Sequence, residues 1–186
     1  MIRICLFLTA FLVSKLAATP ELRPSEARAA FSLLNEIRMH PAAFADTLSF
    51  LKGLPPMPAL KWNDTLARVA AQKALDMATR NYFAHTNPDG FGMNYFINQA
   101  GYKLQPSWIQ DKTANYFESC AAGATTGKEA IAMLLVDDGV PSFGHRTHLL
   151  GLNDWSRSLV DIGIGYAWAG GASNYISYTC VLIAKH

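Results

Sequence analysis

Histidine and carboxylate side chains occur in three segments of this sequence, next to residues that favour turns or end regular elements. His85 follows a helix-like run, Glu118 stands beside a cysteine, and Asp137 and Asp138 close an apolar run ahead of His145. Neutral imidazoles are good ligands for zinc, copper or nickel, and nearby carboxylates orient such ligands or hold a water molecule. The histidines are therefore candidate metal ligands, and the acids are candidate neighbours of such a site.

Each of these residues also has an ordinary structural explanation. A histidine behind a helix can cap its last carbonyl groups, as His85 would. His145 and His148 are three residues apart, so both can lie on the exposed side of one helix. Asp137 and Asp138 can simply end a helix and begin a turn at Gly139. The residue types alone leave these alternatives open.

The chemistry of a two-histidine site is limited by its ligand count. A catalytic zinc ion normally has three protein ligands and a water, so we expect weak, exchangeable binding of zinc or another divalent cation. With metal bound, Glu118 is the candidate general base of a metal-assisted hydrolase. Without metal no nucleophile is evident, because nothing in the sequence shows that the hydroxyl of Ser142 meets a base.

The elements that must position these residues belong to one domain with a leader segment. The chain has 186 residues, of which 51% are hydrophobic and 16% charged, which suits one sizeable core. Residues 1–18 combine a basic start, a short apolar run and small residues, so they are predicted to be a signal peptide. Residues 19–186 are predicted to form a single secreted, extracellular domain without a transmembrane segment, because no later stretch reaches the roughly 18 apolar residues of a membrane span.

Charge and cysteine content narrow the function further. Residues 1–18 carry Arg3 and Lys15 and no acid, so the remaining chain is formally neutral and lacks the basic footprint of a nucleic-acid-binding protein. Cys5 falls in the predicted signal peptide. Cys120 and Cys180 remain as an even pair in an oxidising compartment and are predicted to form a disulfide, with two buried thiols as the alternative.

The sequence predicts helices in the first part of the chain and strands near its end. Helices are expected over residues 24–41, with Ser25 as a candidate cap, over 42–51, and over 63–83, where Asn63 or Asp64 is the cap. Asn63 also begins a glycosylation sequon. Strands are expected over 159–168 and 174–184, joined by a glycine-rich hairpin turn. Helices packed on a largely antiparallel sheet define an α+β fold.

Several segments resemble, in the right order, the landmarks of the CAP superfamily. These are the cysteine-rich secretory proteins, antigen-five allergens and pathogenesis-related proteins, which share an SCP-like domain. The segments are LLNEIRMHP, LKWNDTLARVAAQKALDMA, FAHTN, FES, GHRTHLL and YTCVLIA, and they span residues 33–184. The GHRTHLL segment resembles the variant found in the simpler bacterial-type members.

The resemblance implies an α-β-α sandwich with a three-stranded antiparallel sheet between helices. It also implies a central cleft with two histidines and two acidic residues, in which some members bind a divalent cation. Carried over by position, the histidines are His85 and His145 and the first acid is Glu118. The second acid falls on Asp137 or Asp138, and the resemblance does not decide between them.

This chain departs from the family pattern at three positions of that cleft. Ser119 replaces the usual asparagine, the second acid is an aspartate where relatives carry glutamate, and His148 stands where relatives often carry glutamine or asparagine. A shorter second acid favours a water-bridged contact with a metal ion, and His148 either adds a ligand or keeps a hydrogen-bonding role. The chain also lacks the cysteine-rich extensions of venom and sperm relatives.

These observations predict a secreted binding or interaction protein whose two-histidine, two-acid cleft holds a divalent cation weakly. The first alternative is a metal-dependent, peptidase-like hydrolase that uses the same cleft. The second is a lipid- or sterol-binding protein. Its only candidate segments for lining a lipid-binding groove are the aromatic run GFGMNYF and the proline-rich LPPMPAL. The expected partner is accordingly a protein or a lipid, since family resemblance indicates fold better than activity.

Overall fold

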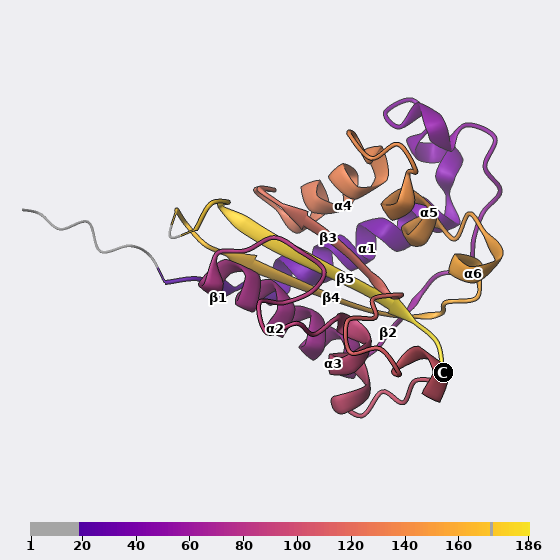
Figure 1. Ribbon diagram of the computed structural model, residues 1–186. Helices are drawn as coiled ribbons and strands as arrows, with labels where there is room; N and C mark the ends of the chain where they lie inside the picture. The colour runs from indigo at the N-terminus through magenta and orange to yellow at the C-terminus, as the bar shows by residue number, and fades with distance from the viewer. Residues whose placement is uncertain (1–18, 172) are drawn as a thin grey trace, which may run out of the picture.

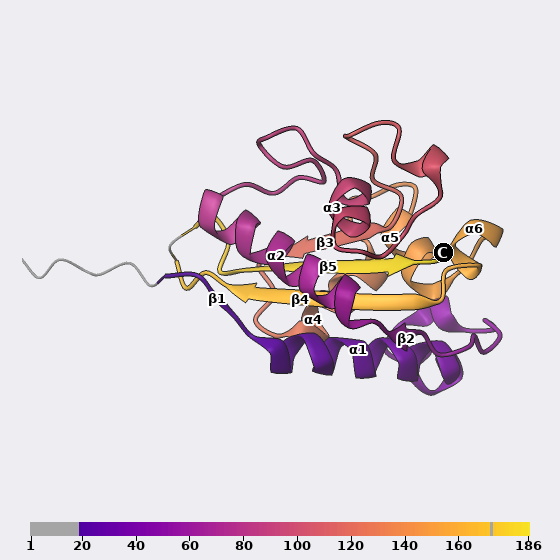
Figure 2. The same cartoon turned by 90° about the horizontal axis from the view of Figure 1, so that it is seen from below.

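A computed structural model describes residues 19–171 and 173–186 of the chain. Figures 1 and 2 show three layers, with a sheet between two sets of helices. The predicted α-β-α sandwich is therefore confirmed. The predicted signal peptide, residues 1–18, lies outside the described residues. Among the residues described, no helix has the length and apolar character needed to cross a membrane.

The sheet is built around three adjacent antiparallel strands. These are β3 (Glu118–Ala122), β5 (Ser177–Ala184) and β4 (Asp161–Trp168), with β5 in the centre. Two strands of two residues extend the predicted three-stranded sheet. β1 (Glu21–Leu22) pairs with β4 in antiparallel fashion, and β2 (Lys61–Trp62) pairs with it in parallel. β3 therefore lies at one edge of the sheet.

Helices cover both faces of the sheet. α2 (Asp64–Arg80) packs against β4 and β5, and α3 (Met93–Gln99) lies beside α2. On the other face, α1 (Pro24–Met39) packs against α4 (Gly127–Val136), and Figure 2 shows α3 and α1 on opposite sides of the sheet. The short helices α5 (Gly144–Leu150) and α6 (Asp154–Arg157) follow α4.

The two longest helices form where the sequence predicts them, but only α2 has the predicted cap. Asn63 caps α2, because its side-chain oxygen accepts hydrogen bonds from the amides of Thr65 and Leu66. Ser25 does not cap α1. Pro24 occupies the first helical position and places Arg23 at the cap, where no side chain bonds to the helix.

The predicted helix over residues 42–51 is wrong. Two short 3₁₀-helices, Pro41–Phe44 and Ser49–Leu51, occupy this segment instead, and a third covers Pro106–Trp108. The segment between the first two contains Asp46 and Thr47, whose side chains compete with helical hydrogen bonds and favour turns. Both predicted strands are present but begin later than expected, and the glycine-rich turn joins them as β4 and β5.

The contact between α2 and β4 depends on two glycines in the strand. A Cβ atom at Gly163 would collide with the backbone of Leu66 and Ala67, and one at Gly165 with the backbone of Ala70. Backbone atoms cannot move aside as the end of a side chain can. These glycines therefore set the distance between α2 and the sheet, and α2 leads directly into the segment that carries His85.

Gly163→Ala is expected to lower the free energy of unfolding by about 3 kcal/mol, because the added methyl group forces α2 away from the sheet. Urea denaturation measures the change. Gly144→Ala is the control, since its Cβ would meet only the Ser142 side chain, at 3.4 Å. Equal stabilities of the two variants would contradict this account of the packing.

Candidate functional site

His85 is held over strand β3 by a buried lysine of α2. The ammonium group of Lys73 donates hydrogen bonds to the backbone carbonyls of Ala84, at 2.7 Å, and His85, at 2.9 Å. Lys73 is only 4% exposed, so this anchor lies inside the protein. This role could not be predicted from the sequence, because a lysine in an amphipathic helix is usually solvated.

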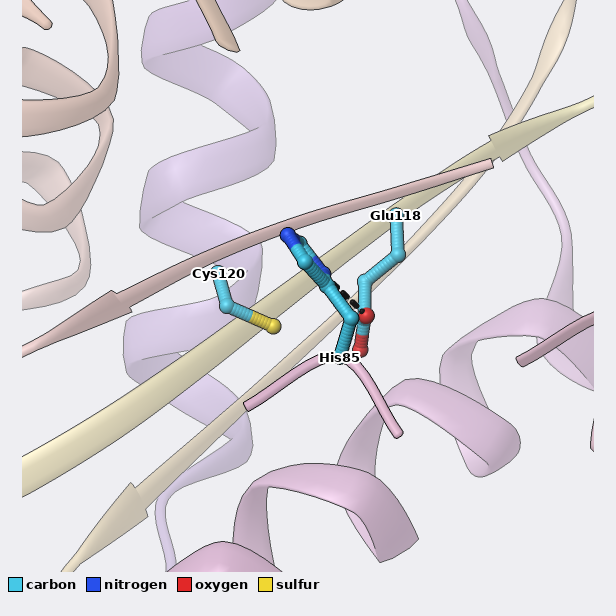
Figure 3. Close-up of side chains that lie close together, drawn as sticks. All are labelled: His85, Glu118 and Cys120. Carbon is cyan, nitrogen blue, oxygen red and sulfur yellow. Dashed lines mark hydrogen bonds and ion pairs between the residues drawn. The ribbon is translucent and has the colours of Figure 1, made fainter. Parts of the chain in front are cut away.

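Glu118 begins β3 and turns its carboxylate toward His85. His85 Nδ1 lies 2.7 Å from Glu118 Oε2. Figure 3 marks this contact with a dashed line. The Asn115 side-chain amide donates to the same oxygen at 3.0 Å. The thiol of Cys180 contacts the other oxygen, Oε1, at 3.5 Å. The Glu118 side chain is fully buried, so these groups replace its hydration.

Asp137 is the second acid of the site, and Asp138 is exposed on the surface. Asp137 ends α4 in a left-handed conformation, with φ of 56°, which points its carboxylate at the start of α5. The carboxylate accepts from the backbone amides of His145 and Arg146 and lies 2.6 Å from His145 Nδ1. It therefore caps α5 and orients His145 at the same time.

Arg146 lies beside this pair but points away from it. Its guanidinium donates to the backbone carbonyls of Leu135 and Val136, the last residues of α4. It also lies over the rings of Phe50 and Phe143. Arg146 thus joins α4 to α5 and is a structural residue, as its helix-terminal contacts require.

The two histidines line one cavity, of about 340 Å³, between the start of β3 and α5. Its other lining residues include Tyr116 and Trp155. The side chains of Glu118 and Asp137 are 0% and 1% exposed, whereas those of His85 and His145 are 52% and 25% exposed. Each pair therefore has a buried acid behind an accessible imidazole. The structure brings together His85, Glu118, Asp137 and His145, and leaves Asp138 outside.

Two of the residues that depart from the family resemblance contact each other. Ser119 Oγ and His148 Nδ1 lie 2.7 Å apart, so the serine that replaces asparagine meets the histidine that replaces glutamine or asparagine. The other ring nitrogen of His148 is buried without a hydrogen-bond partner among the described residues. His148 also lines the cavity, but its bonded partner is the serine hydroxyl.

The environments of His85 and His148 shift their pKa values in opposite directions. The pKa of His85 is raised by the neighbouring Cys120 side chain and by the hydrogen bond to Glu118. A cation that binds His85 must therefore displace a tightly held proton. Burial lowers the pKa of His148 to about 4, so this imidazole is neutral at physiological pH.

The predicted disulfide between Cys120 and Cys180 is wrong. The two residues lie directly opposite each other on β3 and β5, but both are free, buried thiols. Each sulfur has a polar neighbour other than its cysteine partner. Cys180 bonds to the Glu118 carboxylate, and Cys120 lies within 4.8 Å of ligand atoms of His85 and Glu118. The alternative of two buried thiols holds.

Comparison with known proteins agrees with this fold. The model of the CAP family, described as the cysteine-rich secretory protein family, matches residues 31–182. The chain therefore belongs to the CAP family. No curated protein sequence matches the chain.

Solved structures give the same result at low sequence identity. An extracellular protein from Bacillus anthracis that contains an SCP domain is 22% identical, with a TM-score of 0.55. That match covers 87% of this chain and 41% of the Bacillus protein, so the chain spans less than half of its length. An outer surface protein from Borrelia burgdorferi is 18% identical, with a TM-score of 0.55, over 87% of this chain and 94% of that protein. At these low identities, the similarity to the two structures shows a common fold and nothing more.

Protein denatured without a reducing agent is expected to react with a thiol reagent at both Cys120 and Cys180, because neither sulfur is cross-linked. Mass spectrometry of the labelled peptides measures this, with a fully reduced sample as the control. A peptide pair joined through these two residues would contradict the structure.

The free energy of unfolding is expected to fall as the pH drops from 6.5 toward about 4, because over this range the unfolded chain binds a proton at His148 and the folded chain does not. The variant His148→Gln keeps a partner for Ser119 but cannot titrate. Urea denaturation above and below pH 6.5 should therefore show a weaker pH dependence for the variant. An unchanged dependence would show that His148 titrates normally.

Proposed function

We propose that this chain is a secreted CAP-domain binding protein whose cleft holds a divalent cation between His85 and His145. The observation that carries the proposal is the matched pair of histidine–carboxylate contacts, at 2.7 and 2.6 Å, behind one shared cavity. Metal-binding histidines commonly use one ring nitrogen for the metal and the other for such a carboxylate. With Nδ1 of each ring directed at an acid, Nε2 of each ring remains for a cation.

The donor set favours a borderline cation such as zinc, copper or nickel. Imidazole nitrogen suits these metals, and two protein ligands leave further coordination positions for water or for a donor from a partner. A cation with open positions in a cleft can connect the protein to a second molecule. The exposed aromatic rings of Tyr116 and Trp155 line the same cavity and supply apolar contact area for such a partner.

The environment of Glu118 favours binding over hydrolysis. A general base needs a carboxylate that can reach a water at the metal. The carboxylate of Glu118 is fully buried and contacts His85, Asn115 and Cys180. It is therefore a positioning group for His85. Hydrolase activity and lipid or sterol binding stay predictions from the sequence.

Secretion is the second part of the proposal. It is supported by the signal-peptide pattern of residues 1–18 and by the two similar structures, one described as an extracellular protein and the other as an outer surface protein. We expect the partner outside the cell to be a protein or a lipid.

Calorimetric titration with zinc at neutral pH tests the cation site. The unmodified protein is expected to bind about one equivalent, and His85→Ala and His145→Ala are each expected to weaken binding by at least about tenfold. His40→Ala is the control, because His40 is an exposed histidine outside the cavity. Binding that is indifferent to both cavity histidines would overturn the proposal.

The neighbouring aspartates provide a second, matched comparison. Asp137→Asn is expected to weaken zinc binding by about 10- to 100-fold, because the buried carboxylate orients His145. Asp138→Asn should leave the affinity unchanged, since this side chain is exposed. Thermal melting of both variants checks that the fold is intact. Equal effects of the two substitutions would show that Asp137 does not position the ligand.

A further inference from the structure

Cys120 adds a thiol to the buried side of the site. Ligand atoms of His85, Glu118 and Cys120 all lie within 4.8 Å of one another, and Figure 3 shows the three side chains converging. Glu118 and Cys120 are buried, and His85 is the exposed member that separates them from solvent. This group combines a nitrogen, an oxygen and a sulfur donor, and the two-histidine site uses only the nitrogen.

The backbone explains why these donors meet. Successive side chains of a strand point to opposite faces, so Glu118 and Cys120 share one face of β3, and His85 lies on that face. Ser119 points to the other face, where it meets His148 of α5. The Lys73 contacts then hold His85 above Glu118 and Cys120. The arrangement is fixed by the strand and by an anchored loop.

We propose that His85, Cys120 and Glu118 form a thiolate-containing site for a thiophilic cation such as zinc, cadmium or cobalt. This inference rests on the proposed function, because the cation must reach His85 through the same cavity. Binding breaks the S–H bond of Cys120, forms a metal–sulfur bond and releases the proton to solvent, with no change in oxidation state. With His145 across the cavity, His85 and Cys120 give three protein ligands, which is the ligand number of an exchangeable zinc site.

The cation preference of the protein follows from this donor set. A site of two imidazoles accepts nickel or copper as readily as zinc, whereas a thiolate selects softer metals. The carboxylate of Glu118 keeps its role of orienting the His85 imidazole. Cys180 contacts the other oxygen of Glu118 and lies outside the group. It is therefore a matched control, as a second buried, free cysteine in the adjacent strand.

Titration of the reduced protein with cobalt(II), followed by absorption, tests the site. Sulfur bonded to cobalt produces a charge-transfer band in the near ultraviolet, which nitrogen and oxygen ligands do not produce. The band is expected to saturate at about one equivalent. It should be lost in Cys120→Ser and in His85→Ala, weakened in His145→Ala, and retained in Cys180→Ser.

The outcomes separate this inference from the proposed function. Cobalt binding that needs both His85 and His145 but gives no sulfur band would overturn the thiolate site and leave the two-histidine site standing. A band that needs Cys180 and not Cys120 would also overturn it. Absence of any cobalt binding would overturn both proposals.

A measurement on the unmodified protein removes any dependence on variants that fold poorly. X-ray absorption of the reduced protein with one equivalent of zinc is expected to show a sulfur neighbour at about 2.3 Å. A first shell of nitrogen and oxygen alone would contradict the assignment of Cys120 as a ligand.

Discussion

Glu118 and Asp137 place two carboxylates almost completely out of solvent, and the site is organised around the donors that they require. A buried charge is tolerated only when it is paired and hydrogen-bonded. Glu118 obtains donors from the His85 ring, the Asn115 amide and the Cys180 thiol, and Asp137 obtains them from the start of α5 and the His145 ring. The orientation of both imidazoles therefore follows from the burial of the acids.

The elements of the fold bring these donors to the acids from different parts of the chain. The close contact between α2 and β4, made possible by Gly163 and Gly165, leads the chain after α2 toward β3. On the other face, Asp137 connects α4 to α5 and so delivers His145. The site lies at the edge strand β3, where residues from both faces of the sheet can meet.

The sequence predicted the parts of the site that local signals carry. The segments around His85, Glu118 and His145 have turn formers or helix signals next to the reactive residue, and their order resembles a known family. It could not choose between Asp137 and Asp138, because only the left-handed conformation of Asp137 decides which carboxylate turns inward. Lys73 and Asn115 were missed, since their roles depend on contacts made only in the folded chain.

The same division between local and tertiary signals holds for the fold. The cap at Asn63, the strands β4 and β5 and the turn between them follow from local patterns. No α-helix forms over residues 42–51, because turn-forming residues interrupt this segment. The cysteine count predicted which two residues face each other, and it did not predict that their thiols stay free. Here the Glu118 carboxylate and the His85 ring are the polar neighbours of the two thiols.

The central claim is that the two histidine–carboxylate pairs serve one cation. Anomalous diffraction from crystals soaked in zinc tests it most directly. The account predicts one peak in the cavity, at about 2.0–2.1 Å from a nitrogen of both His85 and His145. An empty cavity, or a zinc ion bound by only one of the two histidines, would contradict it.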